Sequence, residues 1–229
     1  MRLKSFCTGF LLAFPVVADA EEPAPAPASV PESSPVPVGT SYRVDSAASW
    51  VYVVVRNDRT APAAGLGKDH AVRANEFAGT VVWDKSAASV CRVDITIPVA
   101  SLRADPAGMR ERAGLSGVVA DAERALVEEN LRSSRQLDLI RFPVVTFHAE
   151  KCVGTTGKVK VTGDLSIHGV VKPVSVVLDV TQDGKQFSAK GSFKLTHADL
   201  GMDPFTSLMG SLRNSPDLVF VVDLVGSAG

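Results

Sequence analysis

The chain has 229 residues, of which 45% are hydrophobic and 21% charged, and its formal net charge is −1. This composition is typical of a globular protein and argues against a disordered or membrane-embedded chain. The basic residues do not cluster along the sequence, so the chain lacks the electrostatic footprint of a nucleic-acid-binding protein.

The first twenty residues predict a secretory signal peptide. Arg2 and Lys4 precede the apolar run 6–17, and Ala-Asp-Ala follows, which together have the three-part form of a cleavable export signal. The alternative is a membrane anchor, but twelve residues interrupted by a proline are too few to span a bilayer. We therefore expect cleavage after Ala20, export, and no stable membrane insertion.

Residues 21–40 contain six prolines together with alanine and serine. This composition predicts an extended linker with partial polyproline II character. A proline-rich ligand for an aromatic groove is the alternative. The folded domain is then expected to cover residues 41–226.

Eight segments with strand character follow, bounded by Gly, Asp, Lys or Pro. In most of them apolar and polar residues alternate, so each strand has one apolar and one polar face. The expected strands are 49–56, 77–84, 91–99, 144–152, the two arms of the hairpin 158–180 (which turns at His168–Gly169), 187–195 and 217–225.

A helical segment separates the third strand from the fourth. Residues 106–135 are rich in Ala, Glu, Arg and Leu, and 121–131 has apolar residues near helical spacing. Gly114 and Gly117 are expected to divide the region into two short helices. We expect this insertion to lie outside the sheet.

Antiparallel strands with one apolar face can form a sandwich or a closed barrel. Nearly all the expected connections are tight hairpins between sequence neighbours, and closure also removes exposed strand edges. The sequence therefore predicts an all-β fold with a helical insertion, built as an eight-stranded antiparallel up-and-down β-barrel.

A barrel of eight strands is just wide enough to be filled by side chains or to hold one small ligand. Five small residues fall in mid-strand on the apolar face among larger ones, which favours a cavity; the alternative is that glycines let strands bend at barrel corners. The expected lining residues are Phe77, Gly79, Val81, Trp83, Ile95, Ile97, Phe147, Ala149, Gly163, Leu165, Ala189, Gly191 and Phe193.

Several motifs carry a family resemblance. Segment 130–151 has a Leu-Arg-Ser helix end and a Phe-Pro strand start, and 161–180 contains the run GDLSIHGVVKPV. These segments, with 41–55 and 187–201, resemble the YceI-like polyisoprenoid-binding family over most of the chain. The resemblance implies a lipocalin-like barrel, exported to the periplasm, that holds a polyisoprenoid or other fatty-acid-like lipid and catalyses no reaction.

Residues with catalytic or metal-binding chemistry are few. The four histidines have no metal-ligand spacing, and the sequence contains no nucleophile, phosphate-loop or paired-carboxylate motif, so no catalytic residue, metal or cofactor is expected. His148 is expected on the outer face and His168 in a turn. Residues that could form the cavity mouth lie in loops: His70, His197, Phe205 and Met209. The apolar loop that holds the last two could instead simply pack on the barrel end.

Cys91 and Cys152 are the two cysteines that remain once the signal peptide is removed. An even count in an oxidising compartment favours a disulfide. Cys91 faces inward, whereas strict alternation from Phe147 places Cys152 outside, so the bond needs a bulge near Glu150–Lys151. Two independent buried thiols are the alternative.

Two function classes remain open. The first is a carrier that holds an apolar lipid in the barrel. The second is an exported structural or stress-associated domain with a filled barrel, which binds a protein partner through its helical insertion. The sequence does not determine the oligomeric state and leaves a homodimer open.

Overall fold

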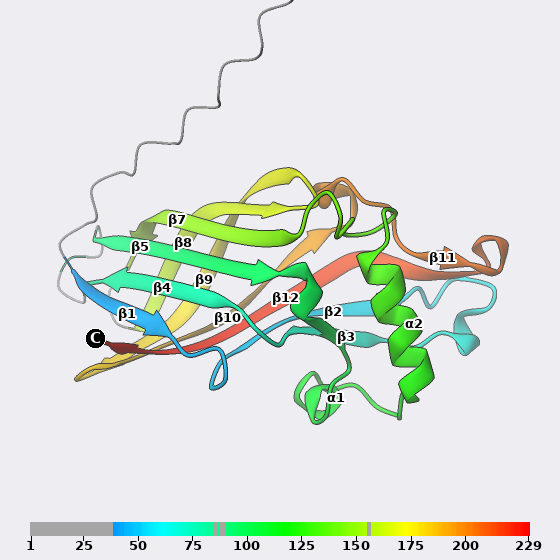
Figure 1. The fold of residues 1–229 in the computed structure, drawn as a ribbon, viewed down its shortest axis with the longest axis horizontal. Coiled ribbons are helices and arrows are strands. Elements are labelled where there is room, and N and C mark those ends of the chain that lie inside the picture. Colours follow the sequence, from blue (N-terminus) through cyan, green and yellow to red (C-terminus); the bar gives the residue numbers. More distant parts are fainter. Residues whose placement is uncertain (1–38, 85–86, 88–89, 155–156) are drawn as a thin grey trace, which may run out of the picture. The chain divides into compact units, whose positions relative to one another are not determined.

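A computed structural model describes residues 39–84, 87, 90–154 and 157–229 (Figure 1). The expected signal peptide and all but the last two residues of the expected linker lie outside the described residues. The first strand begins at Thr40 and the last ends at Ala228.

The described residues form twelve strands, two α-helices and four short 3-10 helices. The strands are β1 (Thr40–Val44), β2 (Trp50–Asn57), β3 (His70–Ala74), β4 (Ala78–Trp83), β5 (Cys91–Pro98), β6 (Leu102–Ala104), β7 (Val144–Val153), β8 (Gly157–Ile167), β9 (Val170–Asp183), β10 (Gln186–Thr196), β11 (Thr206–Ser207) and β12 (Leu212–Ala228). The helices are η1 (Ala64–Leu66), η2 (Val99–Ser101), α1 (Met109–Arg112), α2 (Asp121–Arg132), η3 (Ala198–Leu200) and η4 (Leu208–Gly210).

Eight antiparallel strands close into a barrel in the order β1-β4-β5-β7-β8-β9-β10-β12, and β12 pairs with β1 to complete the ring. The predicted barrel is therefore confirmed, with one difference in its first strand. The expected strand 49–56 is β2, which pairs with β12 beside β1 and continues into β3 and β6. Since β12 is 17 residues long, its end can pair with β1 while its earlier part pairs with β2.

Strand β3 lies in a segment that was expected to be a loop. Its sequence, His-Ala-Val-Arg-Ala, has weak strand propensity, but it pairs with β2 on one side and β6 on the other. The expectation that His70 lies in a loop was therefore wrong, because His70 begins this strand.

The helical insertion between β6 and β7 divides as predicted. Gly114 (φ 65°) and Gly117 (φ 76°) adopt left-handed conformations between α1 and α2, which glycine allows without steric cost. Helix α1 and the residues after it cover the outer face of β2 and β3. There a buried cluster forms from Tyr52, Val54, Ala71, Met109 and Leu115.

The predicted bulge in β7 is present. The register between β7 and β8 shifts between Ala149 and Lys151, which turns the side chain of Cys152 inward. Cys152 is bonded to Cys91 on β5, with their Cα atoms 5.8 Å apart. The disulfide therefore joins two neighbouring strands inside the barrel.

Candidate ligand-binding cavity

The barrel encloses a cavity of about 360 Å³. Its wall is formed by inward side chains of the ring strands and of β2. Several of these residues are only partly buried although they point inward, among them Ile97, Phe147, Phe193, Phe220 and Val222. In a packed interior they would be fully buried, because protein interiors leave few voids larger than a water molecule. The interior is therefore not filled by the protein itself.

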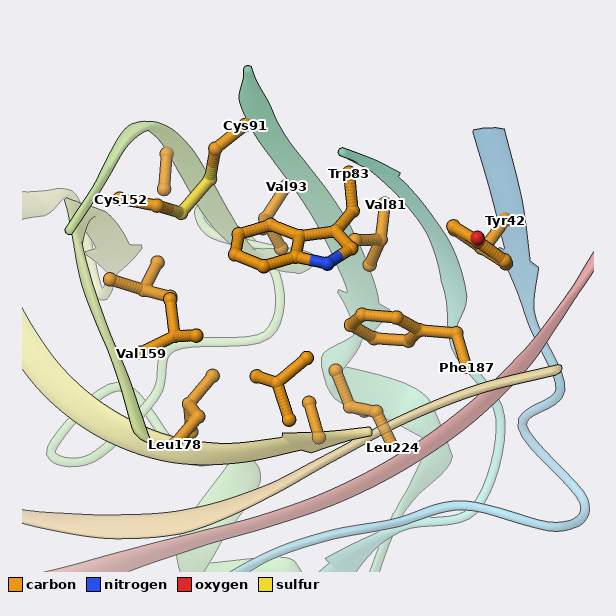
Figure 2. Packing of buried hydrophobic residues seen from close by; sticks show 14 of the residues in the cluster. Tyr42, Val81, Trp83, Cys91, Val93, Cys152, Val159, Leu178, Phe187 and Leu224 are labelled. Atoms are coloured by element: carbon orange, nitrogen blue, oxygen red, sulfur yellow. A yellow bond between two sulfur atoms is a disulfide. The ribbon is translucent and has the colours of Figure 1, made fainter. Parts of the chain in front are cut away.

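One end of the cavity is closed by aromatic and aliphatic side chains (Figure 2). Trp83 is 2% exposed and Phe187 4%, and Tyr42 stacks on Phe187 with ring centroids 5.2 Å apart. The Cys91–Cys152 disulfide lines the same end (Figure 2). Solvent is excluded here, so this region, called the closed end below, is the bottom of the cavity.

The opposite end is the mouth, and its residues come from three segments that are far apart in sequence. Helix α2, the segment from η1 to β3 and the segment around β11 contribute Leu66, Gly67, Lys68, Glu123, Val127, Asn130, Phe205, Leu212 and Asn214. Leu66 is 73% exposed, which places it at the rim. Lys68 and Glu123 form an ion pair with Nζ and Oε2 2.5 Å apart. The mouth is therefore open and carries both polar and apolar side chains, whereas the bottom is apolar and sealed.

His70 lines the cavity near its mouth and is held by a buried carboxylate. Its Nδ1 lies 2.6 Å from Oδ2 of Asp105, whose side chain is fully buried. The Ala71 amide and Arg110 also donate to Asp105, at 3.0 and 3.1 Å. Burial acts to raise the pKa of Asp105, but hydrogen bonds from His70 and Ala71 and the charges of His70 and Arg110 outweigh it and lower the pKa. An ionised Asp105 therefore fixes the orientation of the imidazole.

His197 also lines the cavity and is 3% exposed. Burial lowers the pKa of His197, since a charged imidazole loses its hydration there. Its Nδ1 lies 2.9 Å from the Pro216 carbonyl oxygen, to which the neutral ring donates. This histidine is therefore a neutral wall residue.

The predicted site residues divide into two groups. Those on the cavity wall or mouth are Val81, Trp83, Ile95, Ile97, Phe147, Leu165, Ala189, Phe193, His70, His197 and Phe205. Those that are not among its lining residues are Phe77, Gly79, Ala149, Gly163, Gly191 and Met209. Phe77 and Ala149 pack in the core around the closed end instead. Met209 is fully exposed in η4.

The glycines were expected to leave space for a ligand, and this interpretation was wrong. A Cβ atom at Gly163 would overlap the His148 carbonyl oxygen and come within 2.5 Å of Ala149 Cβ, opposite the bulge in β7. At Gly191 it would lie 2.6 Å from the Val177 carbonyl oxygen. The small residues allow neighbouring strands to approach closely, which is the alternative role of glycine in a curved sheet.

Several wall residues were missed because two strands are covered on both faces. Strands β2 and β12 are covered on their outer face by the α1 region, so their sequences are nearly continuous apolar runs. Because apolar and polar residues do not alternate there, the sequence does not show which side chains point inward. The missed wall residues on them are Val51, Val53, Val55, Leu218, Phe220, Val222 and Leu224. At the mouth, no local signal links Lys68 to Glu123 or His70 to Asp105.

Helices long and apolar enough to cross a membrane do not occur in the part of the chain that the structure describes. Within the same residues, no group of three or more His, Cys, Asp or Glu side chains is placed to hold a metal ion.

Comparisons with known proteins agree with the barrel. A family model for the YceI-like domain matches residues 42–223. Protein YceI from Escherichia coli O157:H7 is 24% identical over 156 residues, which cover 65% of this chain and 70% of the relative. Protein YceI from Salmonella arizonae is 25% identical over the same shares.

Two solved structures share the fold. Burkholderia cenocepacia BcnA matches with a TM-score of 0.59 and 20% identity, over 80% of this chain and 98% of BcnA. A Campylobacter jejuni YCEI protein matches with a TM-score of 0.52 and 17% identity, over 69% and 84% of the two chains. At these identities the likeness bears on the fold alone.

Proposed function

Because the chain belongs to the YceI-like domain family, we propose that this binding protein is exported and holds a polyisoprenoid or another long-chain apolar lipid inside its barrel. The observation that carries the proposal is the cavity, which is walled by apolar side chains and is not filled by the protein. Binding there would remove apolar ligand surface from water, at about 0.8 kcal/mol for each methylene group.

The lining of the cavity supports a ligand with an apolar chain and, where the ligand is charged, a charged group at one end. The chain would lie along the apolar wall, and a charged group would remain at the mouth beside Lys68 and His70. Sealed apolar space combined with a few polar groups at the entrance is typical of small-molecule sites. Export is supported by the sequence of residues 1–20 and by the disulfide, which suits an oxidising compartment.

The alternative of a filled barrel does not fit the cavity, whereas binding of a protein partner through the helical insertion stays a prediction. The expectation that the chain catalyses no reaction stays a prediction.

The direct experiment is to purify the full chain from its host, extract it with organic solvent and identify the apolar molecules by mass spectrometry. An intact mass that lacks residues 1–20 would support export. Purified protein is then titrated with linear alcohols of increasing length. We expect about a fourfold gain in affinity for each added methylene until the cavity is full.

A matched pair of variants tests the location. Val222 points into the cavity and is partly exposed there, whereas Val177 is 54% exposed and is not among the lining residues. Val222→Phe is expected to weaken binding of the longest ligands at least tenfold, because it fills the cavity. Val177→Phe should leave binding unchanged. Equal binding by both variants, or no apolar ligand at all, would overturn the proposal.

A further inference from the structure

The closed end of the cavity contains a hydrogen-bond donor that has no acceptor. Trp83 is the last residue of β4, is 2% exposed and lines the cavity. Its Nε1 is buried and has no hydrogen-bond partner among the described residues. The indole N–H of a buried tryptophan usually finds a partner, because an unpaired donor away from water costs free energy.

The surroundings of this indole are apolar. Figure 2 shows the ring of Trp83 between the Cys91–Cys152 disulfide and the ring of Phe187. Val159 and Leu178 line the same space. The described side chains around the indole therefore offer packing and no oxygen or nitrogen acceptor.

A trapped water molecule would not satisfy the unpaired N–H donor of Trp83. A buried water needs two to four polar partners, and the described residues that line the closed end provide the single Trp83 donor. The Tyr42 hydroxyl accepts a hydrogen bond from Gln182 and does not belong to the cavity lining. The missing acceptor must come from the ligand.

We infer that the ligand carries a neutral carbonyl oxygen at the end that lies deepest in the barrel, and that Trp83 Nε1–H donates to it. This inference rests on the proposed lipid-binding function and narrows the class of ligand. The oxygen is neutral because the closed end has no cation among its described lining residues, and a carboxylate or phosphate buried without a counter-charge would be strongly disfavoured. Charged groups of a ligand belong at the mouth, where Lys68 lies.

The test compares a linear alkane with the methyl ketone of the same carbon number. Wild-type protein is expected to bind the ketone about tenfold more tightly, which is the effect of satisfying one buried donor. Trp83→Phe removes the donor and keeps an aromatic ring, so the preference for the ketone should be lost, because its carbonyl oxygen would then be buried without a donor. The ratio of the two affinities is the readout, because it cancels any loss of packing that affects both ligands.

Trp50→Phe is the matched control. Trp50 is the second of the two tryptophans and lies on the outer surface, where the guanidinium groups of Arg73 and Arg112 stack at 3.9 and 4.3 Å from its ring centroid. This variant should keep the tenfold preference. It also leaves Trp83 as the single indole, so fluorescence then reports occupancy of the closed end.

A measurement on the unmutated protein covers the case in which Trp83→Phe does not fold. The indole N–H resonance of Trp83 is expected to move downfield when the ketone binds and to stay in place with the alkane. Equal affinities for the two ligands in wild-type protein, or an unchanged preference in Trp83→Phe, would overturn the inference while leaving lipid binding intact. Absence of binding by either ligand would instead overturn the proposed function.

Discussion

The two ends of the barrel are held together in different ways. At the closed end, strands β4, β5, β7 and β8 meet, and the residues between them are buried and include the disulfide. At the mouth, helix α2 lies over strand ends and loops, toward the other end of the barrel from the C-terminus (Figure 1). All twelve residues of α2 are described, and none of them is buried.

Helix α2 is held by polar contacts together with the partly buried Leu131, which packs against a hydrophobic cluster. Glu128 on α2 accepts a hydrogen bond from the Ala104 amide at 3.1 Å, and Arg132 donates to the Leu102 carbonyl oxygen at 3.0 Å. Lys68 reaches Glu123 from the other side. Exposed pairs of this kind contribute little each, and elements with few buried contacts open most readily. A ligand would therefore enter beside α2, while the closed end keeps its shape.

The largest expected effect comes from breaking the closed end. The disulfide joins residues 61 positions apart, and loss of such a cross-link costs about 4 kcal/mol of stability in the chain-entropy model. We expect reduction, or the double substitution Cys91→Ala and Cys152→Ala, to lower the free energy of unfolding by this amount. Denaturant titration of oxidised and reduced protein measures it. Two free thiols in the denatured, unreduced mature protein would contradict the bridge.

A smaller effect is expected from a methyl group added between two neighbouring strands of the barrel. Gly163→Ala forces a Cβ atom against the backbone of β7, and such overpacking costs about 1–3 kcal/mol. Gly65 lies at the rim in η1, and a Cβ atom there would meet nothing within 4 Å. Gly65→Ala should therefore leave the unfolding midpoint unchanged. Equal unfolding midpoints for the two variants would show that the close packing of β7 against β8 adapts to a methyl group as easily as the exposed η1 does.

This contrast also shows what the sequence could reveal about the fold. The alternation of residues 158–180 predicted the hairpin β8–β9 and its turn, where His168 and Gly169 have φ values of 51° and 74°. The extra strands β3 and β6 could not be predicted, because they are short and depend on pairing with β2 and with each other. Local pattern identifies long strands, whereas short ones are stabilised by tertiary pairing.

The sequence likewise predicted only part of the candidate site. Alternation placed Val81, Ile95 and Phe147 on the inner face, and they line the cavity. A glycine on the inner face can either leave space for a ligand or allow a neighbouring strand to approach closely. At Gly163 the backbone of the adjacent strand occupies the space, which the sequence does not reveal. The mouth was mostly beyond reach, since its ion pair joins Lys68 to a residue 55 positions away.

A third prediction concerns pH. Burial lowers the pKa of His197 below its usual value of about 6.5, and this outweighs the hydrogen bond to Pro216 and the charge of Asp203. The unfolded chain therefore binds a proton more readily, so stability falls as the pH drops below about 6.5, by at most about 1.4 kcal/mol per pH unit for one proton. His197→Asn keeps a donor for the carbonyl of Pro216 and removes the titration.

The check is the free energy of unfolding of both proteins between about pH 7.5 and pH 5.5, the range in which histidine titrates. The variant should lose less stability than the wild type over this interval. An identical pH dependence in the two proteins would count against a buried neutral His197.

The smallest effect on stability, and the most specific effect on function, is expected at the mouth. Lys68→Ala breaks the pair with Glu123, whose side chains are 40% and 35% exposed, so the loss of stability should stay below about 1 kcal/mol. Because both residues line the cavity entrance, the variant should exchange bound ligand several-fold faster in stopped-flow displacement.

Lys158→Ala is the control for this variant. Lys158 pairs with Asp179 at 2.6 Å on the outer wall, between β8 and β9, and is more exposed than Lys68. The substitution Lys158→Ala removes the same charge and a comparable ion pair but leaves the mouth unchanged, so ligand exchange should keep its wild-type rate. If both variants accelerate exchange equally, net charge controls entry; if only Lys68→Ala does, the contact between α2 and the η1 segment limits how fast the ligand passes.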